Sequence, residues 1–350
     1  MDSAPSSEVD HRQLTRLAKR SIRELQQRFG QYLSDLNAAA VDRVETLGRV
    51  ELLDRVELLD RVETVHQLRV TSRRADVALR IFKAWLPRDD RNRMRTTLRE
   101  IRDDAGVVRD LDLLEQRWGR TAEPDSTTLS SATPLSAATT AWLRTRIRDL
   151  QANARRQMDR WTRRSVRARL RKRSATLVRR VRRRTRRTAE AALRHALAKL
   201  ARRLIAALPA TADSLPEAHR TRIRARQLRY ALELLRPVLP EDVIAMRPLL
   251  IQMQDQLGRL NDDATSLRFL ENSIAACNEA DVQPVLRQLL EQAESAAANH
   301  LAEWHAGLTS QIEQLGRVLR ESPSFHGRRG RTSDSAEQGV SSIVPRRDHS

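Results

Sequence analysis

The chain of 350 residues carries a formal net charge of +20, and only 3% of its residues are aromatic. Its 10 glycines and 12 prolines are about half the share found in average soluble proteins, which argues against a fold with many tight turns. Arg, Leu, Ala, Glu and Gln dominate, so we predict an all-α fold. The arginine excess favours a polyanionic partner, because one guanidinium can bind two phosphate oxygens at once.

The sequence lacks the features of exported and membrane-spanning proteins. Its first ten residues show no signal-peptide pattern, and no run of about 18 apolar residues occurs, so we expect no membrane insertion. The single cysteine, Cys277, excludes an internal disulfide and favours a reducing, cytoplasmic location. Residues 1–10 and 322–350 are rich in Ser, Gly, Pro and charge, and we predict that they are disordered tails.

A hexapeptide is repeated in tandem between residues 43 and 64, as RVETLG, RVELLD, RVELLD and RVET. Its apolar residues fall at every third position, so they form a stripe that drifts slowly around a helix. One interpretation is an arm lengthened for a function. The other, which we favour, is a tandem duplication tolerated because it extends a helix.

A longer repeat divides the chain into two related halves. The segment HQLRVTSRRADVALRIFKAWLP begins at His66, and HRTRIRARQLRYALELLRPVLP begins at His219. The halves are predicted to span about residues 11–118 and 141–321, joined by a hydroxyl-rich linker over 119–140. Helix stops are predicted at five prolines and glycines: Pro87, Gly106, Pro209, Pro240 and Gly258.

Each copy of this repeat predicts an amphipathic helix with one cationic face. The apolar faces contain Leu68, Ala75, Ala78, Leu79, Phe82 and Leu86 in the first copy, and Leu228, Ala231, Leu232, Leu235 and Leu239 in the second. Cations one turn apart offer paired donors about every 5 Å, which suits a linear polyphosphate. A solvated charged face is the alternative, but few carboxylates interrupt the row, which favours anion binding.

Four elements then carry a resemblance to a known family. They are H-x-x-R-V-x-x-R-R at His66, Arg69, Val70, Arg73 and Arg74; G-x-x-R-D-L-D at Gly106, Arg109, Asp110, Leu111 and Asp112; the basic run ending in L-R-Y-A-L-E at His219, Arg222, Arg224, Arg226, Leu228, Arg229, Tyr230 and Glu233; and L-G-x-L-N-D at Leu257, Gly258, Leu260, Asn261 and Asp262. With these, residues 11–321 resemble the CHAD family, the conserved-histidine α-helical domain.

The resemblance implies two helical bundles related by a pseudo-twofold axis around a basic channel. It also implies binding of inorganic polyphosphate, association with polyphosphate granules, and no cofactor. The expected binding residues are His66, Arg69, Arg73, Arg74, Arg80, Lys83, His219, Arg222, Arg224, Arg226, Arg229 and Arg236, supported by Arg109, Asp110, Tyr230 and Asp262. Two alternatives stay open. The histidines either contact phosphate or pack at a helix junction, and the two aspartates either orient arginines or cap helix N-termini.

One position departs from the family pattern. The family usually has a basic residue ten positions after the first histidine, where this chain has Asp76; the counterpart of Asp76 in the second half is Arg229. A carboxylate in the cationic face either repels the ligand or holds a neighbouring arginine in an ion pair.

A second basic feature, residues 155–187, supports a different hypothesis. More than half of this segment is Arg or Lys, and Asp159 is its one acid. It could act as a nucleic-acid or ribosome-binding arm, although it has one Trp where single-strand binders use several aromatic platforms. A thin apolar stripe predicts that one edge of it docks on the protein: Trp161, Val166, Leu170, Leu177 and Val181.

An enzyme is the least favoured class. The sequence has no glycine-rich phosphate loop and no metal-ligand spacing. It also lacks the E-x-E-x-K strand of the triphosphate-tunnel domains to which CHAD domains are often fused. We therefore expect a stand-alone binding module with no catalytic residues and no metal site.

Overall fold

The structure is a computed structural model that describes residues 11–45, 51–118, 135–182, 184–208 and 214–321. The predicted tails at 1–10 and 322–350 lie outside these ranges. Within them, all regular structure is helical, which confirms the predicted all-α class. The elements in chain order are α1 (His11–Glu45), α2 (Glu51–Ile81), the 3₁₀ helix η1 (Phe82–Ala84), α3 (Arg88–Trp118), α4 (Ala137–Asp159), α5 (Arg164–Arg179), α6 (Arg186–Ile205), α7 (Leu215–Leu235), η2 (Arg236–Val238), α8 (Glu241–Ile244), α9 (Arg247–Ala276) and α10 (Gln283–Glu321).

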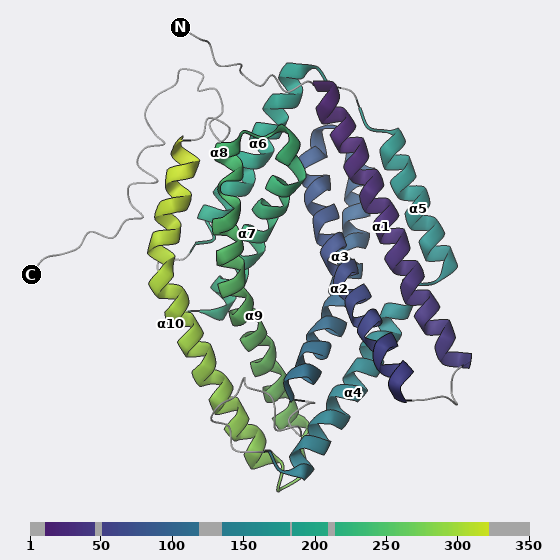
Figure 1. Cartoon of the computed structure of the whole chain (residues 1–350), viewed down its shortest axis with the longest axis vertical. Helices are drawn as coiled ribbons and strands as arrows, with labels where there is room; N and C mark the ends of the chain where they lie inside the picture. The colour runs from purple at the N-terminus through teal and green to yellow at the C-terminus, as the bar shows by residue number, and fades with distance from the viewer. Residues whose placement is uncertain (1–10, 46–50, 119–134, 183, 209–213, 322–350) are drawn as a thin grey trace, which may run out of the picture.

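The helices form two groups that lie side by side along the long axis of the molecule (Figure 1). In the first group, α2 packs between α1 and α3, and in the second, α9 packs between α7 and α10. The two groups touch mainly where α2 meets α7 and α6. The helices that carry the two predicted cationic faces therefore lie at the junction between the groups.

The boundary between the groups differs from the predicted linker. Both α4 and α5 follow residues 119–140 in the chain, yet α4 packs on α3 and α5 packs on α1. α4 buries the apolar residues Leu143, Ile147 and Ala154, and it starts at Ser136, whose side chain accepts a hydrogen bond from the Thr139 N–H. The first bundle therefore consists of α1 to α5, and the second begins with α6.

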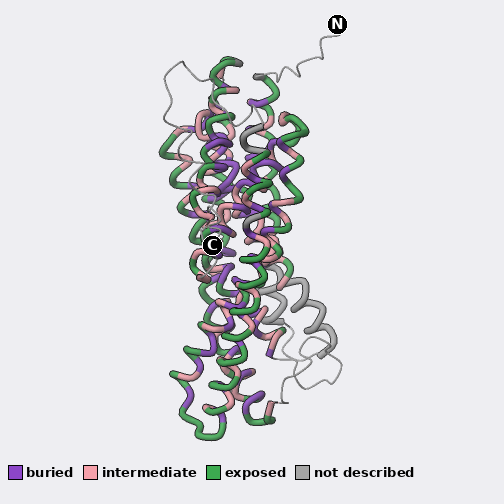
Figure 2. The backbone as a smooth tube through the Cα atoms, turned by 90° about the vertical axis from the view of Figure 1, so that its left-hand side faces the viewer, coloured by how far each residue is buried: buried purple, intermediate pink, exposed green. Residues whose placement is uncertain are grey.

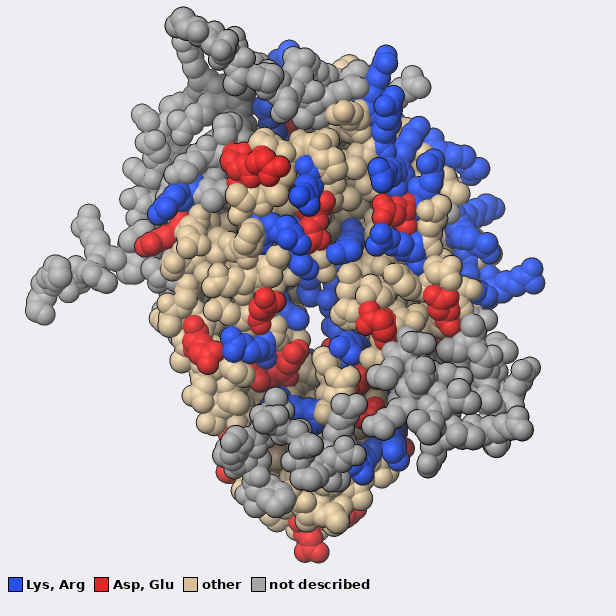
Figure 3. Space-filling model, in the orientation of Figure 1, with Lys and Arg blue, Asp and Glu red and all other residues tan. Residues whose placement is uncertain are grey.

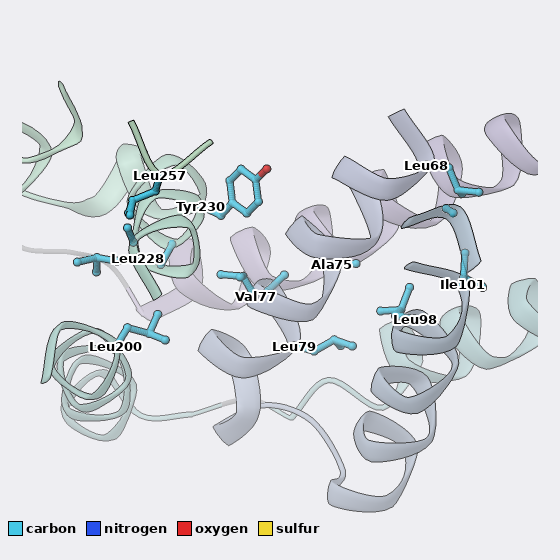
Figure 4. Packing of buried hydrophobic residues seen from close by; sticks show 14 of the residues in the cluster. Leu68, Ala75, Val77, Leu79, Leu98, Ile101, Leu200, Leu228, Tyr230 and Leu257 are labelled. Atoms are coloured by element: carbon cyan, nitrogen blue, oxygen red, sulfur yellow. The ribbon is translucent and has the colours of Figure 1, made fainter. Parts of the chain in front are cut away.

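The cores of the two bundles are built from the predicted apolar faces. Figure 4 shows Leu68, Leu79 and Leu98 between α2 and α3, with Leu228 in the second bundle. A row of buried positions also runs through the interior of both groups (Figure 2). The apolar residues predicted on each copy of the long repeat are buried or partly buried, which confirms the two amphipathic helices.

The two glycines predicted to stop helices do not do so. Gly106 lies inside α3 and Gly258 inside α9, so Asp110 and Asp262 are in mid-helix and are not N-caps. A glycine costs a helix interior about 1 kcal/mol, which is small beside the burial of several large side chains. α3 alone buries Leu98, Ile101, Leu111 and Leu114, among others.

The hexapeptide repeat and the basic segment 155–187 also form parts of these helices. The hexapeptide repeat is divided between the end of α1 and the beginning of α2, and residues 46–50 between them lie outside the described ranges. The basic segment 155–187 forms the end of α4, all of α5 and the start of α6. Its predicted docking stripe is confirmed, because four of the five residues are buried and Val166 is partly buried: Trp161, Leu170, Leu177 and Val181.

Candidate anion-binding site

Two arginines from equivalent positions of the long repeat approach each other at the junction of the bundles. Burial, followed by the nearby charges of Arg226 and Arg69, lowers the pKa of Arg73 on α2 to about 8. Burial and Arg222 likewise lower the pKa of Arg226 on α7 to about 9. No carboxylate is among the main influences on either group, and within the described residues neither has an ion-pair partner. The junction thus holds two cations that repel each other without compensation.

An outer arginine lies beside this pair in each half, and each is accompanied by a carboxylate. Arg69 Nη1 donates to Asp110 Oδ1 at 2.9 Å, so Asp110 orients Arg69. Burial lowers the pKa of Arg222, while the charges of Asp262 and Asp110 act in the opposite direction. We call these four arginines, Arg69, Arg73, Arg222 and Arg226, the central arginine cluster.

Gly106 lets Arg69 lie close to α3. A Cβ built on Gly106 would meet the Arg69 guanidinium at 3.7–3.8 Å, which is ordinary contact. Alanine therefore fits at this position. The glycine of the G-x-x-R-D-L-D element does not stop the helix, and it faces the Arg69 guanidinium.

The two histidines of the repeat border the cluster. Burial and the charge of Arg109 lower the pKa of His66. His219 Nδ1 lies 3.0 Å from Asn261 Oδ1. Partial desolvation and the charge of Arg222 lower the pKa of His219, while the hydrogen bond with Asn261 raises it. Both imidazoles are therefore neutral near pH 7, and each stands where an added anion would favour its protonation.

A second group of cations surrounds Tyr230 and Glu233 on α7. The guanidinium carbons of Arg74 and Arg229 lie 5.4 and 4.9 Å from the centre of the Tyr230 ring. Glu233 forms ion pairs with Arg229 at 3.4 Å, and with Arg74 and Arg247 at 3.5 Å. These arginines already have a carboxylate partner, unlike the pair at the junction.

An opening passes between the two bundles at the middle of the molecule, and Lys and Arg side chains lie at its edges (Figure 3). A linear anion could therefore reach the basic residues of both halves.

Comparison with known proteins now adds to this geometry. The family model for the CHAD domain matches residues 47–271, which is more than half of the chain. The chain belongs to the CHAD family. Among solved structures, the crystal structure of the CHAD domain from the plant Ricinus communis matches with a TM-score of 0.51 and 20% sequence identity, covering 87% of this chain and 92% of that one. At this identity the likeness establishes a shared fold. No curated protein matches the chain.

The CHAD pattern predicted one row of cations along α2, but the structure divides it. Arg73 lies toward Arg226 on α7, and Arg69 lies between Asp110 on α3 and Arg222 on α7, whereas Arg80 and Lys83 border a separate pocket between α3 and α6. Asp76 is buried and accepts hydrogen bonds from Arg80 Nε and Arg95 Nε, both at 2.7 Å. Of the two alternatives for this departure from the CHAD pattern, the ion pair is therefore the one observed.

Lys83 borders a pocket of about 160 Å³, which we call the Lys83 pocket. Desolvation, then the charges of Lys199 and Arg91, lower the pKa of Lys83. Arg80, which was predicted, also lines this pocket. Sequence reasoning missed the remaining four cations, although each pair is spaced i, i+4 on its helix: Arg91 and Arg95 on α3, and Lys199 and Arg203 on α6. This i, i+4 spacing of basic residues was the sequence signal that could have identified them.

The remaining predicted CHAD residues are less closely connected to the cluster. Arg109 on α3 lies near His66 and Asp112. Arg224 donates to Gln227 at 3.3 Å, and Arg236 is exposed on η2. Among the described residues of this CHAD chain, no helix is long and apolar enough to cross a membrane, and no group of three or more His, Cys, Asp or Glu residues could hold a metal.

Proposed function

We propose that this chain binds inorganic polyphosphate at the central arginine cluster and catalyses no reaction. The observation that carries the proposal is the partly buried pair of Arg73 and Arg226, which have no ion-pair partner among the described residues. Because a guanidinium keeps its proton far better than other bases, the repulsion between them is relieved best by a bound anion. CHAD domains in general bind polyphosphate, which agrees with this reading.

The symmetry of the ligand supports the choice of polyphosphate. Equivalent residues of the two halves, Arg73 and Arg226, meet at the junction, as a twofold relation between the halves predicts. A linear polyphosphate looks the same from either end, so donors related in this way can contact it equally from both halves. The twofold relation itself stays a prediction.

Association with polyphosphate granules would follow directly from such binding, and we include it in the proposal. Granule association requires that the site bind the interior of a long polyphosphate chain rather than only its ends. The opening between the bundles has basic residues at its edges (Figure 3). Such an opening is suited to binding the interior of a polyphosphate chain.

The competing candidate is a nucleic-acid-binding protein that uses α5. This helix docks through its apolar edge and leaves several arginines exposed, among them Arg163, Arg169 and Arg179. Basic side chains project from that side of the molecule (Figure 3). Exposed arginines on one helix suit non-specific contact with phosphate groups of any polyanion.

A competition experiment separates the two candidates. Long-chain polyphosphate and duplex DNA of equal total charge compete for the protein at about 0.15 M salt. The double variant Arg73→Gln/Arg226→Gln is compared with Arg169→Gln/Arg179→Gln, which removes the same charge from α5. We expect polyphosphate to win and only the first variant to lose most of its affinity. Preferential binding of DNA, or a greater loss in the α5 variant, would favour the second candidate.

A further inference from the structure

A large apolar cavity lies inside the first bundle, away from the central arginine cluster. Helices α1, α2, α3 and α5 border a partly open space of about 380 Å³. Its apolar walls come from all four helices: Ile22, Leu25, Phe29 and Leu33; Ala75, Ala78 and Leu79; Met94 and Leu98; and Leu170 and Leu177. None of the four arginines of the cluster borders it. The space falls within the range of small-molecule sites, about 300–1,000 Å³.

The cavity exists because small residues stand where four helices meet. Gly30 and Ser34 on α1, Ala75 and Ala78 on α2, and Ser174 on α5 all border it. A Cβ placed on Gly30 would meet nothing within 4 Å, so the space beside α1 is open. Bundle cores are normally filled to the density of organic crystals, and an unfilled space of this size is uncommon.

One edge of the cavity is cationic. Arg164, Arg167 and Arg171 border it from α5, at a spacing of three and four residues that puts them on one side of the helix. Arg167 Nε is buried and has no hydrogen-bond partner within the described residues. Among the described residues, no carboxylate borders the cavity. An apolar space with three cations along one edge matches a molecule with an apolar body and an anionic end.

We propose that this cavity binds a single-chain anionic amphiphile of the fatty-acid class. The acyl chain lies among the apolar residues of α1, α2 and α3, and the carboxylate lies at Arg167 with Arg164 and Arg171 beside it. Charge complementarity selects this occupant over an uncharged one, because charge-assisted hydrogen bonds from guanidinium groups to carboxylates are strong, and Arg167 Nε is buried at this edge. The proposal does not depend on polyphosphate binding, since the two sites share no arginine.

Titration calorimetry with dodecanoate, below its micelle concentration, tests the proposal on the full chain. We expect one saturable site, and affinity at least several-fold weaker for dodecanol, which has the same chain with an uncharged end. Arg167→Gln should weaken dodecanoate binding several-fold and leave dodecanol binding unchanged. Arg169→Gln is the matched control, because Arg169 lies on the same helix but does not border the cavity.

Filling the cavity provides the second arm. Gly30→Leu places a side chain in the open space and should abolish dodecanoate binding while the melting temperature holds or rises; Ala78→Leu serves if that variant fails to fold. Polyphosphate binding by Gly30→Leu should stay as in the parent. Unchanged dodecanoate binding by the filled variant, equal losses in Arg167→Gln and Arg169→Gln, or a dimer that Gly30→Leu dissociates would each overturn the proposal.

Discussion

The two halves of the molecule hold the same ion pair with its signs exchanged. In the first half Asp76 precedes Arg80 by four residues, with 2.7 Å between Oδ2 and Nε. At the equivalent positions of the second half Arg229 precedes Glu233, with 3.4 Å between Nη1 and Oε1. Each carboxylate also binds an arginine from another helix, Arg95 in the first case and Arg247 in the second.

The comparison explains why an acid can stand where the CHAD pattern has a base. Residues four apart on a helix face each other, so what the position requires is a pair of opposite charges rather than a particular residue. Asp76 alone looks like a lost phosphate contact. Asp76 and Arg80 form the same ion pair as Arg229 and Glu233 with the order of the charges reversed. The net charge of the pair is therefore the same in both halves.

The largest expected effect comes from breaking the first pair. Asp76→Arg restores the family pattern but leaves Arg80 and Arg95 beside a third buried cation. The Asp76 side chain is only 10% exposed, so we expect a loss of about 3 kcal/mol in the free energy of unfolding. Chemical denaturation of the variant and the parent measures this loss.

A charge exchange sharpens the same test. The double variant Asp76→Arg/Arg80→Glu copies the Arg229 and Glu233 arrangement into the first half. We expect it to recover much of the stability lost by the single variant, because the new glutamate can pair with both residue 76 and Arg95. A double variant no more stable than Asp76→Arg would show that the two halves are not interchangeable at this pair.

The second prediction concerns the arginines that the two halves contribute equally. Arg73→Gln and Arg226→Gln should each weaken polyphosphate binding by about 2 kcal/mol, roughly thirtyfold, as expected for one charged hydrogen bond. Each should also stabilise the unliganded protein, because it removes one of two partly buried cations that repel each other. Thermal melting alongside a binding titration measures both quantities. A loss of affinity accompanied by a loss of stability would indicate structural damage, and a large difference between the variants would contradict equal contributions.

The smallest effect is a pH dependence carried by His66 and His219. The pKa of each is lowered in the folded protein, so their contribution to stability is present above the unfolded value of about 6.5 and is lost as pH falls through the folded value. A bound polyanion favours the protonated form. We therefore expect polyphosphate affinity to rise a few-fold between pH 7 and about 5.5.

The double variant His66→Gln/His219→Gln provides the control for this pH dependence. Both its stability and its affinity should change less over the same interval. If its affinity rises as steeply as that of the parent, other groups are responsible.

Local pattern was sufficient to predict the helices and their faces. The spacing of Leu68, Leu79, Leu228 and Leu232 depends only on helix geometry, and these residues are buried as expected. Local pattern wrongly predicted a helix stop at Gly106, because the cost of a glycine in a helix is outweighed by packing against other parts of the chain.

The predicted row of cations on α2 is divided between two sites for the same reason, namely packing from other parts of the chain. Whether a residue of α2 lies toward α7 or toward α6 depends on which helix packs beside it, and nothing in the sequence of α2 specifies this. Arg95 and Lys199 were missed for this reason, since each meets the first-half residues only through tertiary packing. The Arg73 and Arg226 pair could be predicted, because the repeat aligned them and both halves use the same face.

The division of the hexapeptide repeat between α1 and α2 bears on how this gene can change length. Six residues turn a helix by about 600°, so a unit inserted within a packed helix would rotate everything beyond it out of phase. The repeat instead occupies the end of α1 and the beginning of α2, which pack against each other, so an added copy would lengthen these helix ends. An added copy would then leave the orientation of His66 and Arg69 unchanged.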